Sequence, residues 1–170
     1  MIKASNRLIA NNLFEGVAYG ALDLGPEFSS WGEADYVHNL TLTNNTIRDC
    51  NYISRAAAAF MLHGDGGNLM NGNSNVTIQG LTIDNTTASN MYIGASEAVS
   101  IGDVSFLDGY QSNYVLLETW PGSVATFENV SFESVTGKRC VQGGIGQQGI
   151  NMTHLDGRVE GLDANAVQSC

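Results

Sequence analysis

The stretch VTIQGLTIDN, residues 76–85, contains two short runs of alternating apolar and polar residues separated by a glycine. Each run is too short for a helix, and alternation is typical of a strand with one buried face. The same phrase recurs along the chain as RLIANNLFEG, LTLTNNTIRD, VSIGDVSFLD, ATFENVSFES and MTHLDGRVEG. Such a recurrence predicts one supersecondary unit per repeat.

The repeats can be aligned on their last apolar residues, which are Phe14, Ile47, Ile83, Phe106, Phe132 and Val159. Five residues earlier stand Ile9, Leu42, Ile78, Ile101, Phe127 and His154, and three residues earlier stand Asn11, Asn44, Gly80, Asp103, Asn129 and Asp156. Every member of the last column is Asn, Asp or Gly, the types that tolerate a left-handed backbone at low cost. The column predicts a one-residue bend with positive φ between two short strands. We expect Asn44 and Asn129 to turn their side chains inward along a stack.

A third apolar segment follows each pair of strands, as GALDL, AAFML, MYIGA, YVLLE, CVQGG and NAVQS. Three short strands per repeat predict an all-β fold, a right-handed parallel β-helix (solenoid) of about six rungs that forms one domain over residues 1–170. The alternative is a β-sandwich of short alternating strands. Hairpin turns do not explain a bend column at the same offset in every repeat, so we favour the β-helix.

The charge balance limits the class of partner. With 7 basic and 17 acidic residues, the net charge is −10. This disfavours nucleic acid and anionic membranes, which bind basic patches, and pectate unless Ca²⁺ bridges the two. There is no apolar run of about 18 residues that would span a membrane. The start, MIKASNRLIA, lacks the apolar centre of a signal peptide, so a secretion signal would lie outside this chain.

Cysteines and asparagine sequons bear on whether the protein is secreted. An odd number of cysteines, Cys50, Cys140 and Cys170, cannot be fully paired within the chain. A Cys140–Cys170 disulfide and three buried thiols both remain open. The chain also carries six N-x-Ser/Thr sequons. We expect glycosylation of a secreted or surface protein at Asn39, Asn75, Asn85 and Asn151, whereas Asn44 and Asn129, if turned inward, would be poor acceptors. The sequon pattern also arises from the repeat itself, because Asn and Thr recur at fixed positions within it.

Candidate site residues lie where the repeat swells, at the corner between each third strand and the next first strand. The swollen segments are residues 25–38, 63–75, 118–123 and 143–149. Loops on a rigid scaffold are preferred places for binding and catalysis. They carry the candidate catalytic carboxylates Glu33, Asp35 and Asp65, together with Asp23 at the end of the adjacent strand, and the candidate substrate-binding residues Trp31, His63, Glu118 and Trp120.

Tryptophans beside carboxylates suit a neutral sugar. Indole faces stack on pyranose C–H faces, carboxylates accept hydrogen bonds from hydroxyls, and two carboxylates can act as acid and base or nucleophile. The tryptophans can equally fill loop corners, and the charges can be solvated. We find no Ser-His-Asp arrangement, no Cys/His zinc spacing and no dinucleotide fingerprint, and we expect no metal and no cofactor.

These repeats resemble the pectin-lyase-like, right-handed parallel β-helix superfamily over nearly the whole chain. Residues 11–52, with Trp31, Glu33 and the pattern V-x-N-x-T-x-x-N-N-T-I-x-x-C at 37–50, are similar to β-helical glycoside hydrolases such as exo-acting α-galactosidases. The resemblance implies a secreted or surface carbohydrate-active protein of a kind that is commonly metal-independent. The arginine motifs of pectate and pectin lyases and the paired-Asp and GHG motifs of polygalacturonases are absent, so no catalytic residue is carried over.

Two functions are therefore weighed. The first is a protein that acts on or binds a neutral glycan through its corner loops, and the second is a non-catalytic structural or binding solenoid, such as a filament, adhesin or assembly subunit. The strand edges of a terminal rung are liable to pair with other chains. We expect the first rung, with Leu8, Ile9, Leu13 and Phe14, to be covered by another subunit, by missing rungs of the same protein or by a swapped segment.

Overall fold

The computed structural model describes residues 5–26, 35–53, 58–64, 72–87, 89–94, 96–107, 115–118, 124–133, 150–153 and 158–160. In 89, 115–118, 130–133, 150–153 and 158–160 it describes the backbone alone. This part of the chain is all-β and contains no helix. Its strands are β1 (Arg7–Ala10), β2 (Leu13–Glu15), β3 (Leu22–Leu24), β4 (His38–Thr43), β5 (Thr46–Arg48), β6 (Ala58–Leu62), β7 (Ser74–Gln79), β8 (Thr82–Asp84), β9 (Ser89–Ile93), β10 (Ala98–Leu107), β11 (Val115–Glu118), β12 (Val124–Glu133), β13 (Ile150–Thr153) and β14 (Arg158–Glu160).

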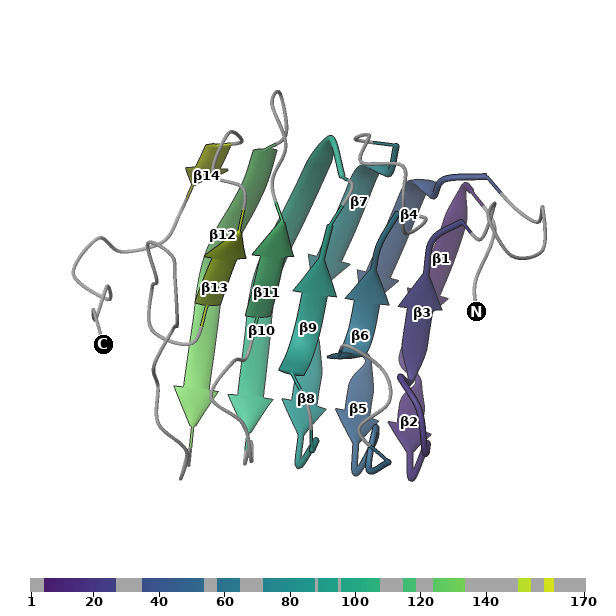
Figure 1. Cartoon of the computed structure of the whole chain (residues 1–170), viewed down its shortest axis with the longest axis vertical. Helices are drawn as coiled ribbons and strands as arrows, with labels where there is room; N and C mark the ends of the chain where they lie inside the picture. The colour runs from purple at the N-terminus through teal and green to yellow at the C-terminus, as the bar shows by residue number, and fades with distance from the viewer. Residues whose placement is uncertain are drawn as a thin grey trace.

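The described strands form two parallel sheets. A five-stranded sheet has the order β13-β11-β9-β6-β3, and a nine-stranded sheet follows β1-β4-β7-β10-β8-β5-β2, with β12 and β14 continuing from β10. Figure 1 shows the five-stranded sheet in front of strands of the larger one. Each strand pairs in parallel with the equivalent strand of a neighbouring repeat, so the predicted all-β class and parallel pairing are confirmed.

The aligned apolar columns predicted from the repeats are stacked in register. Ile9 pairs with Leu42, Leu42 with Ile78 and Ile78 with Ile101. Phe14, Ile47, Ile83 and Phe106 form the second column. These side chains join Leu24 and Phe60 of the five-stranded sheet in one core between the sheets. Burial of their apolar surface is the main favourable contribution to folding.

The bend column adopts the predicted backbone conformation. Asn11, Asn44, Asp103 and Asn129 have φ between 49° and 57°, and Gly80 has φ of 67°. Asp156 lies outside the described residues. Two further columns with positive φ flank the paired strands, one at Asn6, Asn39 and Asn75 and one at Gly16, Asp49 and Asn85.

The predicted inward orientation of Asn44 and Asn129 is wrong, because both side chains are exposed. The left-handed residue turns the chain, so Thr43 and Asn44 both face away from the core and the alternation restarts at Asn45, which is buried. Asn129 does form a bond along the stack, since its Nδ2 donates to Asp103 Oδ1 at 3.0 Å. The inward stack consists instead of the residues that follow the bends.

The last repeat is also placed differently from the prediction. The repeat alignment predicts that Val159 pairs with Phe132, but in the structure it pairs with Ala125, so Arg158–Glu160 extends the first-strand column. Ile150–Thr153 pairs with β11 and occupies the third-strand column. Ile150 and Met152 alternate with polar residues, whereas the expected third strand, CVQGG, ends in two glycines, which weaken a strand. The segments 140–144 and 165–169 lie outside the described residues.

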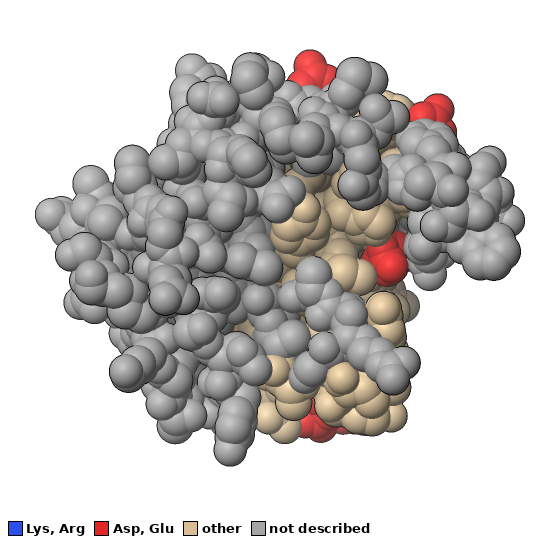
Figure 2. Space-filling view, viewed as in Figure 1, with Lys and Arg blue, Asp and Glu red and all other residues tan. Residues whose placement is uncertain are grey.

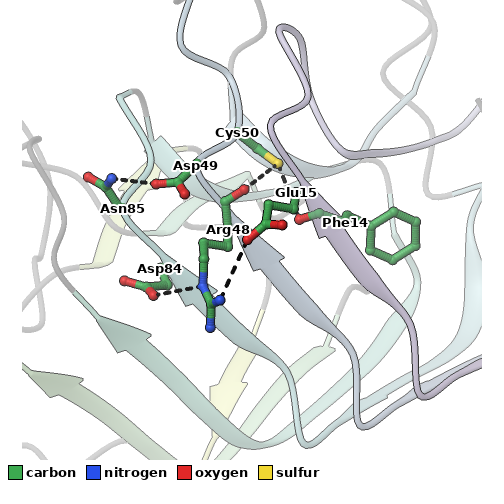
Figure 3. A network of polar contacts seen from close by, with 7 residues as sticks. All are labelled: Phe14, Glu15, Arg48, Asp49, Cys50, Asp84 and Asn85. Carbon is green, nitrogen blue, oxygen red and sulfur yellow. Dashed lines mark hydrogen bonds and ion pairs between the residues drawn. The ribbon is translucent and has the colours of Figure 1, made fainter.

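A network of polar contacts runs across β2, β5 and β8 on the outside of the larger sheet (Figure 3). The Arg48 guanidinium lies between Glu15, at 3.6 Å, and Asp84, at 3.3 Å. Beside it, Asn85 Nδ2 donates to Asp49 Oδ1 at 2.5 Å. Both interactions join residues that the repeat places directly above one another, so polar ladders align the strands on the outside as the apolar columns do within.

Candidate functional site

The outer face of the five-stranded sheet brings together residues from three repeats. In β3, Leu22 and Leu24 are buried in the core while Asp23, between them, faces outward. Strand register places Asp23 beside Met61 of β6 and Met61 beside Tyr92 of β9. Met61 is only 7% exposed and packs with Ala58 and Tyr92 in a cluster separate from the main core. A carboxylate, a thioether and a phenol therefore form one outward column.

Asp23 and His63, both predicted as site residues, are in direct contact. His63 Nε2 lies 2.6 Å from Asp23 Oδ1, and the two side chains are 21% and 22% exposed. His63 Nδ1 lies 2.8 Å from the carbonyl oxygen of Gly64. The contact is possible because β3 and β6 are adjacent and in register. The register brings two residues that are 40 positions apart in the sequence to the same end of neighbouring strands.

The backbone of His63 is fixed on both sides. Its N–H donates to Leu24 O at 2.9 Å, and its carbonyl accepts from Asn73 Nδ2 at 3.0 Å. Asn73 is fully buried, and its Oδ1 accepts the N–H of Val37 at 2.9 Å. Sequence reasoning did not single out Asn73, whose signal is an amide directly before the first residue of β7.

Glycines allow close approach of His63 and of Tyr92 at this face. A Cβ on Gly25, which has φ of 156°, would lie 2.4 Å from the carbonyl oxygen of His63. A Cβ on Gly94 would lie 2.7 Å from the Tyr92 hydroxyl, so the phenol folds over that glycine. Gly94 donates to Leu62 O at 2.7 Å, directly before His63. Tyr92 and Met61, also missed from the sequence, could have been found as the outward positions aligned with Asp23.

The remaining predicted site residues are not brought to this pair by the described contacts. Asp35 Oδ1 accepts the N–H of Tyr36 at 2.8 Å, a local contact before β4. Glu118 ends β11, and its side chain is outside the described part. Trp31, Glu33, Asp65 and Trp120 lie outside the described residues.

The described part of the face in Figure 2 shows acidic side chains among uncharged ones and no visible basic side chain. Among the described residues, no group of three or more His, Cys, Asp and Glu side chains could hold a metal ion. In that same part of the chain no helix is long and apolar enough to cross a membrane.

The sequon asparagines Asn39, Asn75 and Asn85 are exposed, but their amides take part in ladders. Asn75 Nδ2 donates to Asn39 Oδ1 at 2.7 Å, and Asn39 Nδ2 donates to Asn6 Oδ1 at 2.9 Å. Each Nδ2 has a second hydrogen that a glycan bond could replace. Because Asn44 and Asn129 also face outward, the reason for setting them aside as acceptors does not hold. The side chain of Asn151 is not described.

Cys50 is buried at the turn that follows β5, as a free thiol. Its Sγ lies 3.1 Å from Arg48 O and 3.5 Å from Phe14 O. Figure 3 draws both contacts as dashed lines. Desolvation by burial raises the pKa of this thiol, so the group stays protonated at neutral pH. Cys140 and Cys170 lie outside the described residues, and their pairing stays open.

Comparisons of the chain with protein-family models, with curated proteins and with solved structures gave no match.

Proposed function

We propose that the chain is a right-handed parallel β-helix of the pectin-lyase-like kind that binds a neutral glycan on the outer face of β3, β6 and β9. Parallel register between successive repeats and left-handed bends at Asn11, Asn44 and Gly80 support the β-helical part of this proposal. The observation that carries the functional part is the Asp23 carboxylate, which His63 holds at 2.6 Å at the corner where the swollen segments begin.

The chemistry of this column suits a polyhydroxylated, uncharged ligand. A carboxylate accepts hydrogen bonds from sugar hydroxyls, while the ring of Tyr92, packed against the buried Met61, provides an apolar base on which C–H groups can pack. The charge of Asp23 is balanced locally when His63 is protonated, so the ligand need not bring a cation. Trp31 and Trp120 remain the candidate stacking residues.

Hydrolysis needs a second carboxylate. Retaining glycosidases place two carboxyl groups about 5 Å apart, and inverting enzymes place them about 6.5–9.5 Å apart. Asp65 follows His63 by two residues in the sequence, and Glu33 and Asp35 precede β4. The proposed activity is therefore glycan binding at Asp23, with glycoside hydrolysis where one of these residues completes the pair.

Calorimetric titration with galactose- and glucose-containing oligosaccharides tests the proposal. We expect saturable binding that Asp23→Asn weakens about tenfold, which is the loss of one charge-assisted hydrogen bond. Asp84→Asn is the matched control, because Asp84 is a partly exposed carboxylate on β8 that contacts Arg48. Absence of binding across the panel, or equal losses in the two variants, would overturn the proposal.

A second candidate function is a non-catalytic assembly subunit, favoured by exposed apolar residues on the edge strands β1 and β2. Leu8 is 67% exposed and Leu13 56% exposed, in columns that continue as threonines in β4 and β5. We propose that a second copy of the chain covers them. Sedimentation should then show concentration-dependent self-association that Leu8→Ser with Leu13→Ser abolishes, whereas a monomer at high concentration would reject this candidate.

We further propose that the protein is secreted or displayed at the cell surface and glycosylated at exposed sequons. The support is the outward position of Asn39, Asn75 and Asn85 on three bends. Expression through a secretory pathway should give a product whose mass falls on treatment with an endoglycosidase. Asn75→Gln and Asn85→Gln should each remove part of that mass, and an unchanged mass after digestion would reject the proposal.

A further inference from the structure

The two ring nitrogens of His63 both face hydrogen-bond acceptors. Nδ1 lies 2.8 Å from the carbonyl oxygen of Gly64, which can only accept, so Nδ1 carries a hydrogen. Nε2 lies 2.6 Å from a carboxylate oxygen of Asp23. A neutral imidazole has one N–H only, so the second contact requires one more proton, either on the ring or on the carboxyl group.

The pair therefore holds one proton more than a neutral imidazole beside an aspartate, and it is uncharged overall. An imidazole is intrinsically more basic than a carboxylate, so this proton belongs on His63. The imidazolium then donates to both of its neighbours, and Asp23 remains an acceptor. Asp23 of β3 is a charged group in contact with the ring, and Tyr92 of β9 is a titratable side chain in the same outward column as Asp23.

In this arrangement the atom of the pair that can accept a hydrogen bond from a ligand belongs to Asp23 and not to His63. Both nitrogens of His63 are already used within the protein. Asp23 Oδ1 is used by His63, while no described residue donates to Asp23 Oδ2. The sequence predicted His63 as a substrate-binding residue, but its hydrogen-bonding atoms are turned toward Gly64 and Asp23.

We infer that His63 is a positively charged positioning residue that acts through Asp23, orienting the carboxylate so that Oδ2 accepts a hydrogen bond from a hydroxyl group of an uncharged ligand. This inference rests on the proposed glycan-binding function and names the atom that meets the ligand. Deprotonation of His63 would turn a nitrogen lone pair toward the carboxylate, release its orientation and weaken binding.

Two substitutions of His63 separate orientation from charge. The amide nitrogen of a glutamine reaches about as far from the backbone as Nε2, so His63→Gln keeps a donor to Asp23 and removes the titrating group. His63→Ala removes both. We expect His63→Gln to retain affinity for the oligosaccharide panel within about threefold and His63→Ala to lose about tenfold or more. His38→Gln is the matched control, because His38 is a partly buried histidine on β4 whose Nδ1 contacts Ser74.

Nitrogen NMR of the ring gives a readout that does not depend on a ligand. In the wild type near neutral pH, both ring nitrogens of His63 should have the shifts of an imidazolium, and in Asp23→Asn they should be those of a neutral ring. Oligosaccharide affinity of the wild type should fall as the ring loses its proton, and the affinity of His63→Gln should be flat over the same range.

The outcomes distinguish this inference from the proposed function. Binding that is unaffected by His63→Ala, or a neutral His63 ring in the wild type, overturns the inference and leaves glycan binding standing. An imidazolium at His63 with no binding of any oligosaccharide overturns the proposed function, and the positioning role for a ligand falls with it. Equal losses in His63→Ala and His38→Gln would mean that both substitutions act through stability, which also contradicts the inference.

Discussion

Asn45 joins its repeat to the preceding one through its buried side chain, since its Oδ1 accepts both the backbone N–H of Asn12, at 3.1 Å, and Asn12 Nδ2, at 3.0 Å. Its own Nδ2 donates to Ile9 O at 2.8 Å and to Thr43 O at 3.1 Å. The side chain thus supplies partners for the N–H of Asn12 and the carbonyl of Ile9, the backbone groups on either side of the bend at Asn11.

Asn45→Leu should lower the free energy of unfolding by about 2–3 kcal/mol, because leucine leaves the buried carbonyl and amide groups without partners. Urea denaturation followed by circular dichroism measures this change. Asn44→Gly is the control, and it should have little effect because Asn44 is exposed and its φ of 52° suits glycine. Equal midpoints for the two variants would show that the amide of Asn45 is dispensable.

Gly25 should be irreplaceable for a different reason. Gly25→Ala places a Cβ 2.4 Å from the carbonyl oxygen of His63 at a φ that side chains rarely adopt. We expect a loss of roughly 1–3 kcal/mol and a change in the ring signals of His63. Gly16→Ala is the matched control, because Gly16 has φ of 66° with nothing within 4 Å of its Cβ position. It should therefore show left-handed strain alone and leave the spectrum of His63 unchanged.

The apolar columns and the bends were predictable from the sequence because they depend on local rules. Ile9, Leu42 and Ile78 recur at a fixed distance from the bend, so a strand period of two and a left-handed residue suffice to stack them. The side-chain direction at Asn44 was not predictable from residue type, because asparagine suits either face of a bend. It depends on how the alternation restarts at Asn45.

The contacts of the candidate site could not be predicted from the repeat pattern alone. Asp23 and His63 were both named as candidates, but their contact depends on the register of β3 against β6 across a segment of variable length. Met61 and Tyr92 have the residue types of ordinary strand positions, and only the register aligns them with Asp23. The prediction for Val159 was wrong for a similar reason. The segments around Met152 and Val159 are both weak strand patterns, and the sequence does not show which of them pairs in the first-strand column.

Ile47 and Arg48 are neighbours in β5 whose substitutions should have very different effects. Ile47 is fully buried in the core, and Ile47→Ala should lose about 2–5 kcal/mol through lost burial and a cavity. Arg48 is 46% exposed between two carboxylates, and Arg48→Ala should change the free energy of unfolding by less than about 1 kcal/mol. Raising the salt concentration should shrink the second effect and not the first. A large, salt-insensitive loss for Arg48→Ala would contradict this division between core and surface.

The buried thiol of Cys50 should be protected from alkylation in the folded chain. Burial raises its pKa, and the thiolate is the reactive form, so both access and ionisation oppose modification. In a background with Cys140→Ser and Cys170→Ser, iodoacetamide should modify Cys50 rapidly in concentrated urea and slowly without it. Rapid labelling under native conditions would mean that the turn after β5 opens readily.

The same raised pKa predicts how stability depends on pH. The folded chain disfavours the thiolate, so the contribution of Cys50 is fully present below the pKa of the unfolded thiol and is lost as pH rises toward the higher folded value. Urea midpoints of the double serine background should therefore fall with alkaline pH more steeply than those of the same background with Cys50→Ala. Parallel pH profiles for the two proteins would show that Cys50 ionises equally well in the folded and unfolded chains, against the burial that the structure gives it.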